Sequence, residues 1–227
     1  MKTVVFAVAV VLGALLCGGC VGTETGNPSL DPNKVTIVEE TPGILRIDGT
    51  AGAVEPASAL VRVLDLEGTD GFRSITANAD GSFTASFAGD PLRLFRADAL
   101  LGAERSLPFD LRVLGAPGAP IPCLQTAPEA AIELGTFTVG ESRSVPVELV
   151  NSCGALGISF TITAARERLG NGDYMVTTAV PIMLAGGART TTSVDFVASA
   201  SGVSEAVVVF VTDRGDVAAL SLRARVR

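Results

Sequence analysis

The last eight residues, Leu220–Arg227 (LSLRARVR), alternate apolar and polar side chains with a period of two. Successive side chains of a strand point to opposite faces, so this pattern is typical of a half-buried antiparallel sheet. The same alternation runs through Leu107, Phe109, Leu111 and Val113. The one stretch that approaches a helical period, Ala97–Arg105, is too short to form a stable helix alone. The sequence therefore predicts an all-β fold.

A proline-rich segment, GAPGAPIP at residues 115–122, separates two regions with this strand pattern. Proline lacks the N–H group that a central strand needs, so we interpret the segment as an interdomain linker. We predict a first β-sandwich at residues 35–114 and a second at residues 123–227. Both have a normal size for Ig-like domains.

The first region contains RIDGTAGAVEPASALVRVLDLEG followed by RSITANADGSFTASFAGDPLRL. It resembles bacterial Ig-like surface modules. In such a module Asn78–Gly81 would form a turn, and Phe83, Ala85 and Phe87 would point inward from the next strand.

The second region contains LGTFTVGESRSVPVELVNSCG. It resembles abnormal-spindle/hydin-like (ASH-type) Ig domains. The matching positions are Leu134, Gly135, Thr136, Phe137, Gly140, Val145, Val147, Leu149, Asn151 and Cys153, with Ala185, Gly186 and Gly187 at the later Leu-x-Pro-Gly segment. The resemblance implies two tandem Ig-like sandwiches and supplies no catalytic residues.

The first nineteen residues read as a secretion signal, with Lys2 before an apolar run too short to span a membrane. Gly18 and Gly19 precede Cys20, which resembles the lipobox of bacterial lipoproteins. The resemblance implies cleavage before Cys20, lipidation of its thiol by acyl chains such as palmitate, and a flexible tether over residues 20–34. Val21, where aspartate would favour the inner membrane, implies the outer membrane.

The chain has no histidine, which excludes Ser-His-Asp and Cys-His catalysis and His-ligated zinc. It carries 17 basic and 24 acidic residues, a net charge of −7, which disfavours nucleic acid as a partner. Carboxylate-only or Ser-Lys catalysis remains open, although Lys34 is the only lysine after the leader. We expect no enzyme activity, no cofactor and no metal.

After removal of the leader and lipidation of Cys20, Cys123 and Cys153 remain. Two cysteines in an exported protein pair most simply as a disulfide. Buried free thiols, or a redox-active pair influenced by Arg143, are the alternatives.

Five further stretches carry chemically versatile side chains. Acidic Asp65, Glu67 and Asp70 suit either a turn or a Ca²⁺ site. We interpret Asn78–Gly81 as a turn, with a metal site as the alternative. We also interpret Asn171–Tyr174 as a turn that opens a strand, with an exposed binding anchor at Tyr174 as the alternative. Glu39 and Glu40 are neighbours on opposite strand faces, so they cannot form an acid/base pair. Val207–Phe210 is apolar on both faces and predicts a covered central strand, with an interaction surface as the alternative.

These features lead us to expect a non-catalytic, lipid-anchored envelope protein that binds or scaffolds an envelope protein or a glycan. One alternative is a subunit of a larger assembly, joined through strand Leu220–Arg227 or another edge. Another is a carboxylate-dependent glycan hydrolase, which needs two carboxylates across a cleft. The ligand and the oligomeric state stay open.

Overall fold

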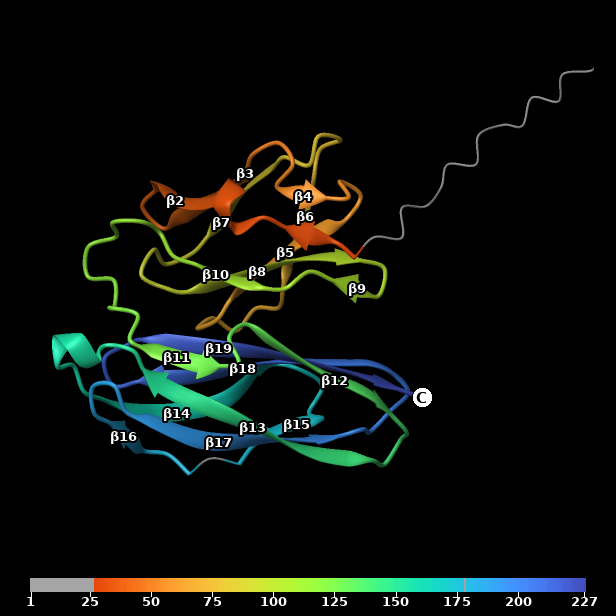
Figure 1. Ribbon diagram of the computed structural model, residues 1–227. Helices are drawn as coiled ribbons and strands as arrows, with labels where there is room; N and C mark the ends of the chain where they lie inside the picture. The colour runs from red at the N-terminus through yellow and green to blue at the C-terminus, as the bar shows by residue number, and fades with distance from the viewer. Residues whose placement is uncertain (1–26, 178) are drawn as a thin grey trace, which may run out of the picture.

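The computed structural model describes residues 27–177 and 179–227 and shows two all-β sandwiches stacked on each other (Figure 1). Their four larger sheets lie in the order β2-β3-β7, β10-β8-β5-β6, β12-β19-β18-β14-β16 and β11-β13-β17-β15 through the stack. The two middle sheets face each other, so the first domain packs on the second through a whole sheet face.

The first domain contains ten strands and one short helix. They are β1 (Ser29–Leu30), η1 (Pro32–Lys34), β2 (Val35–Thr41), β3 (Ile44–Gly49), β4 (Val54–Glu55), β5 (Leu60–Asp65), β6 (Arg73–Thr76), β7 (Phe83–Ala88), β8 (Phe95–Leu101), β9 (Glu104–Arg105) and β10 (Phe109–Leu111). Leu45, Ile47, Val61 and Phe95 are fully or almost fully buried in its core.

The second domain contains nine strands and one short helix. They are β11 (Leu124–Ala127), β12 (Ala131–Phe137), β13 (Ser142–Asn151), η2 (Gly154–Leu156), β14 (Phe160–Leu169), β15 (Tyr174–Val176), β16 (Ile182–Leu184), β17 (Arg189–Val197), β18 (Gly202–Thr212) and β19 (Val217–Val226). No helix in the described part of the chain is long and apolar enough to cross a membrane.

The period-two pattern at the C-terminus forms β19, and its apolar set points into the core of the second domain. Leu220, Leu222, Ala224 and Val226 are at most 4% exposed. On the opposite face, Arg223 lies against the first domain and is 7% exposed, whereas Arg225 and Arg227 are exposed. One strand therefore contributes to the domain core with one face and to the domain interface with the other.

Three expectations need correction. Residues 29–34, expected in the tether, belong to the first domain: β1 pairs with β4, and Leu30 is 6% exposed. Leu107, expected to point inward, is 76% exposed because β10 begins only at Phe109. The strand Leu220–Arg227, considered for pairing with a partner, is occupied on both sides by β12 and β18.

Asn151 ties together three segments at one end of the second domain. Its amide donates to the carbonyl oxygens of Ile158 (2.9 Å) and Leu184 (3.1 Å), and its oxygen accepts from the N–H of Cys153 (3.0 Å). Asn151 is fully buried, so all three partners depend on it for hydrogen bonding. Gly154 follows closely, and a Cβ there would lie 3.0 Å from the backbone nitrogen of Gly187.

We expect Asn151→Ala to lower the free energy of unfolding by about 3 kcal/mol, because two buried backbone groups and one part-buried group lose their hydrogen bonds to this side chain. Urea unfolding followed by circular dichroism measures this. Asn33→Ala is the control: Asn33 is exposed and its side chain bonds only Asp31, so a change below about 0.5 kcal/mol is expected. Equal effects of the two substitutions would contradict the role of Asn151.

Candidate functional site at the domain interface

The centre of the interface is an apolar cluster to which both domains contribute. The first domain supplies Leu64, Leu66, Leu94 and Phe72, and the second supplies Val207, Val209, Val217, Ala219, Leu169 and Val211. In β18, Val207 and Val209 face the first domain while Val208 and Phe210 face the core of the second. This confirms that Val207–Phe210 is a covered central strand.

Arg96, from β8, crosses this interface and uses all five of its N–H donors. Two go to Asp110 in its own domain, from Nε at 2.8 Å and from one terminal nitrogen at 3.0 Å. The other three reach the second domain, at the carbonyl oxygens of Ala130 (3.1 Å) and Ala219 (2.6 Å) and the hydroxyl of Ser221 (3.0 Å). Arg96 is 2% exposed, so every donor must find a protein partner.

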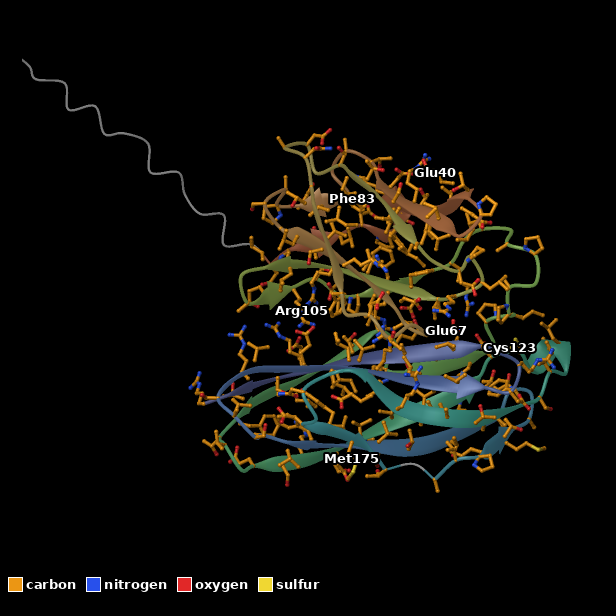
Figure 2. All side chains as sticks on the ribbon, turned by 180° about the vertical axis from the view of Figure 1, so that it is seen from behind. Glu40, Glu67, Phe83, Arg105, Cys123 and Met175 are labelled. Carbon is orange, nitrogen blue, oxygen red and sulfur yellow. A yellow bond between two sulfur atoms is a disulfide. The ribbon has the colours of Figure 1, made fainter. Side chains whose placement is uncertain are left out.

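A second ionic group lies beside Arg96. Arg62 on β5 binds both carboxylate oxygens of Asp98, with an Nε–Oδ1 distance of 2.8 Å, and also reaches Glu205 of the second domain at 3.2 Å. Arg105 on β9 also pairs with Glu205. Figure 2 shows Arg105 between the two sandwiches, whereas Glu40 and Met175 lie on the outer surfaces.

Two further arginines, one from each domain, also cross the interface. Arg168 of β14 donates to the carbonyl oxygens of Asp65 (3.0 Å) and Asp70 (2.5 Å) in the first domain. Arg112 of the first domain pairs at 3.3 Å with buried Asp216, which also accepts the backbone N–H groups of Cys123 and Leu124. The interface is thus fastened from both domains.

Two open grooves lie at this interface, and a third lies within the first domain. One of about 540 Å³ runs between the domains beside Arg96, Phe109 and Leu124. One of about 850 Å³ includes residues 27–30 with Arg105 and Arg223, and one of about 950 Å³ lies among loops of the first domain. Each could admit a small ligand, since ligand pockets span about 300–1,000 Å³.

Each groove also contains two carboxylates, which bears on the hydrolase alternative. The pairs are Asp110 with Glu129, Glu55 with Asp80, and Glu104 with Glu133. A glycosidase of this kind needs a general acid with a raised pKa.

Three of the carboxyl groups in the grooves are held by local partners. Arg96 holds both oxygens of Asp110, Glu104 pairs with Arg225, and hydrogen bonds from Ser82 lower the pKa of Asp80. Burial raises the pKa of three carboxyl groups outside these grooves: Glu67, Glu167 and Asp216.

Cys123 and Cys153 form a disulfide with a Cα–Cα distance of 5.1 Å. Both residues are buried, and Arg143 donates to the carbonyl oxygen of Leu134. The bond links the entry of the second domain to the end of β13. Cys20 and the leader lie outside the described residues, so the lipid anchor stays a prediction.

The acidic stretch at residues 65–70 forms a turn. Asp65 accepts the N–H groups of Glu67 and Gly68 and pairs with Arg93 at 2.9 Å, while Asp70 pairs with Arg73. Within the described ranges, no three acidic or cysteine side chains are grouped to hold a metal ion.

The remaining candidates also have local partners. Asp80 of the Asn78–Gly81 turn accepts from Ser82. Glu39 accepts the N–H of Gly43, and Glu40 pairs with Arg46 at 3.2 Å.

Tyr174 is a core residue. It is 3% exposed, its hydroxyl donates to the carbonyl oxygen of Ser204 at 3.2 Å, and its ring lies 4.9 Å from that of Phe196. The alternative of an exposed binding anchor at Tyr174 is therefore wrong, because its strand turns the ring inward.

Sequence reasoning missed the interface arginines and their carboxylate partners. The available signal was in the strands: Arg62, Arg96 and Asp98 alternate with apolar residues that fill the core. A charged residue between buried neighbours reads as a solvent-facing position when the partner sheet is unknown.

No family model and no curated protein matches the chain. Among solved structures, the ASH/PapD-like domain 7 of human CEP192 is similar at 10% identity, over 52% of this chain and 92% of that one, with a TM-score of 0.38. Fibronectin(III)-like modules of Clostridium thermocellum CbhA share 17% identity over 88% and 94%, with a TM-score of 0.26. Vibrio cholerae VesB protease shares 12% identity over 74% and 62%, with a TM-score of 0.37. These likenesses concern the Ig-like, all-β fold alone.

We expect Arg96→Met to lower the free energy of unfolding by about 3 kcal/mol, because Asp110 and two interface carbonyl groups lose their hydrogen-bond donor. Denaturant unfolding should also show the two domains unfolding in separate transitions. In the control Arg46→Met, which removes exposed ion pairs, the loss should stay below about 1 kcal/mol. A single transition with equal losses in both variants would contradict the role of Arg96.

Burial raises the pKa of Tyr174 to about 12, so the folded state keeps this proton longer than the unfolded state does. The unfolded tyrosine ionises near pH 10, and stability therefore falls as pH rises from about 10 to 12. Tyr174→Phe should remove about 2 kcal/mol of this alkaline loss. Urea unfolding of both proteins at pH 9, 10 and 11 tests it, and parallel pH profiles would refute it.

Proposed function

We propose that this protein is a non-catalytic lipoprotein of the outer membrane, whose second domain is of ASH type. A lipid on Cys20 holds the chain at the membrane, and the two sandwiches act as one rigid binding or scaffolding unit. The fixed interface carries this proposal: Arg96 alone makes three hydrogen bonds from the first domain to the second.

Rigidity distinguishes a scaffold from a hinged pair of domains. Interdomain interfaces are often polar and allow relative motion. Here an apolar cluster from both domains is flanked by arginine–carboxylate pairs, and separating the domains would expose both at once. The two domains therefore keep a fixed orientation relative to each other.

The two ends of the unit differ. Residues 27–30, which follow the tether, lie at the end where the β8–β9 hairpin and the C-terminus are found (Figure 1). The linker and η2 lie at the opposite end. That end exposes Leu114 (87%), Ile121 (52%) and Leu156 (64%). The end near the C-terminus also exposes aliphatic side chains, Leu107 (76%) and Val139 (55%). Exposed aliphatic side chains suit a protein surface better than a glycan, so the partner we favour is an envelope protein.

Strand pairing remains a second candidate mode of assembly. β2 is an edge strand of its three-stranded sheet and is seven residues long. Such an edge offers unpaired backbone groups to a partner strand. Glu39 and Glu40 at its end would favour a partner with basic residues.

Replacing Cys20 tests the anchor directly. In cells fed labelled palmitate, we expect Cys20→Ala to abolish incorporation of label and to release the protein from the membrane fraction, because stable anchoring needs acyl chains. Cys17→Ala is the matched control within the leader and should keep both. Membrane retention and undiminished label in Cys20→Ala would overturn the proposal.

A further inference from the structure

A small cavity lies at the domain interface, close to the β8–β9 hairpin. Its volume is about 20 Å³, enough for one water molecule or one monatomic ion but too small for phosphate. Its walls include Asp98 and Arg105 of the first domain and Glu133, Ser221 and Arg223 of the second.

Two buried donors in this cavity wall have no partner. Nε of Arg105 and Nε of Arg223 are buried without a hydrogen bond in the described structure. The side chains of these residues are only 9% and 8% exposed. A buried, unsatisfied N–H of a charged group is costly, so a missing acceptor is the simplest explanation for both.

The charges around the cavity favour a negative acceptor. Three guanidinium groups, of Arg62, Arg105 and Arg223, meet the carboxylates of buried Asp98 and of Glu205, whose side chain is 22% exposed. Glu133 lies 3.8 Å from Arg223, but its side chain is 67% exposed and its charge is screened by water. Without Glu133, the three arginines and two carboxylates carry one uncompensated positive charge.

The acidity of Arg105 agrees with this charge balance. Burial, together with the positive charges of Arg62 and Arg223, lowers the pKa of Arg105 to about 10. A fixed negative charge between the guanidinium groups would reverse this effect. Glu205 pairs with a terminal nitrogen of Arg105, and Asp98, 3.9 Å from Arg105, already binds Arg62 with both oxygens, so neither carboxylate satisfies Nε of Arg105.

We propose that this cavity is a halide site in which a chloride ion accepts hydrogen bonds from Nε of Arg105 and Nε of Arg223. The ion bridges β9 of the first domain and β19 of the second. Its binding stabilises the closed interface, because separating the domains would split its two ligands.

Bromide provides the direct test. Crystals of the protein grown in sodium bromide should show an anomalous difference peak between the two Nε atoms. A peak without anomalous signal at this place identifies a water molecule and overturns the proposal, as does an empty cavity.

Thermal unfolding at constant ionic strength tests the site in solution. Replacing sodium methanesulfonate by sodium chloride should raise the melting temperature of the wild type saturably, by about 2–4 °C. Arg223→Gln removes one ligand and should abolish this rise, whatever its own stability. Arg225→Gln, on the same strand face and paired with Glu104, should retain it. Equal responses of all three proteins would refute the site.

Discussion

The arrangement of the two domains depends on the burial of one guanidinium group. A buried charge is tolerated only when its hydrogen bonds are complete, and Arg96 completes them only by reaching three acceptors in the second domain. Sliding or tilting one sheet on the other would break several of these bonds together. The geometry of one side chain therefore restricts the relative position of the two sandwiches.

Apolar packing and ionic contacts have different roles in the interface. The valine-rich face of β18 and the leucines of the first domain supply contact area without direction, since the hydrophobic effect depends on area alone. The arginine–carboxylate pairs at the edges fix the relative orientation of the domains, because a planar guanidinium donates hydrogen bonds only in a few geometries. This combination explains how two small sandwiches joined by a proline-rich linker can behave as one body.

Local patterns predicted the β fold well. Alternation placed Leu220 and Leu222 in the core, and the doubly apolar run Val207–Phe210 revealed that its strand was covered on both faces. The disulfide partners also followed from the cysteine count. In each case the required information lies within a few neighbouring residues or in the composition.

Longer-range features could not be predicted in the same way. The alternation that places Leu222 in the core also places Arg223 on the opposite face, and nothing local tells a solvent face from an interdomain face. The pairing of Ser29–Leu30 with β4 is likewise a contact between distant segments, so these residues read as tether. The interface arginines become recognisable only when both sheets are known.

Strand β18 is apolar on both faces, and this has a consequence for folding before the two domains pack together. Until the first domain covers this strand, the second domain has an exposed apolar sheet face with charged groups at its edge. This face is formed by Val207, Val209, Val217 and Ala219. Produced without the first domain, the second domain would tend to associate with its own copies. The first domain therefore protects the second domain from self-association by covering this apolar face.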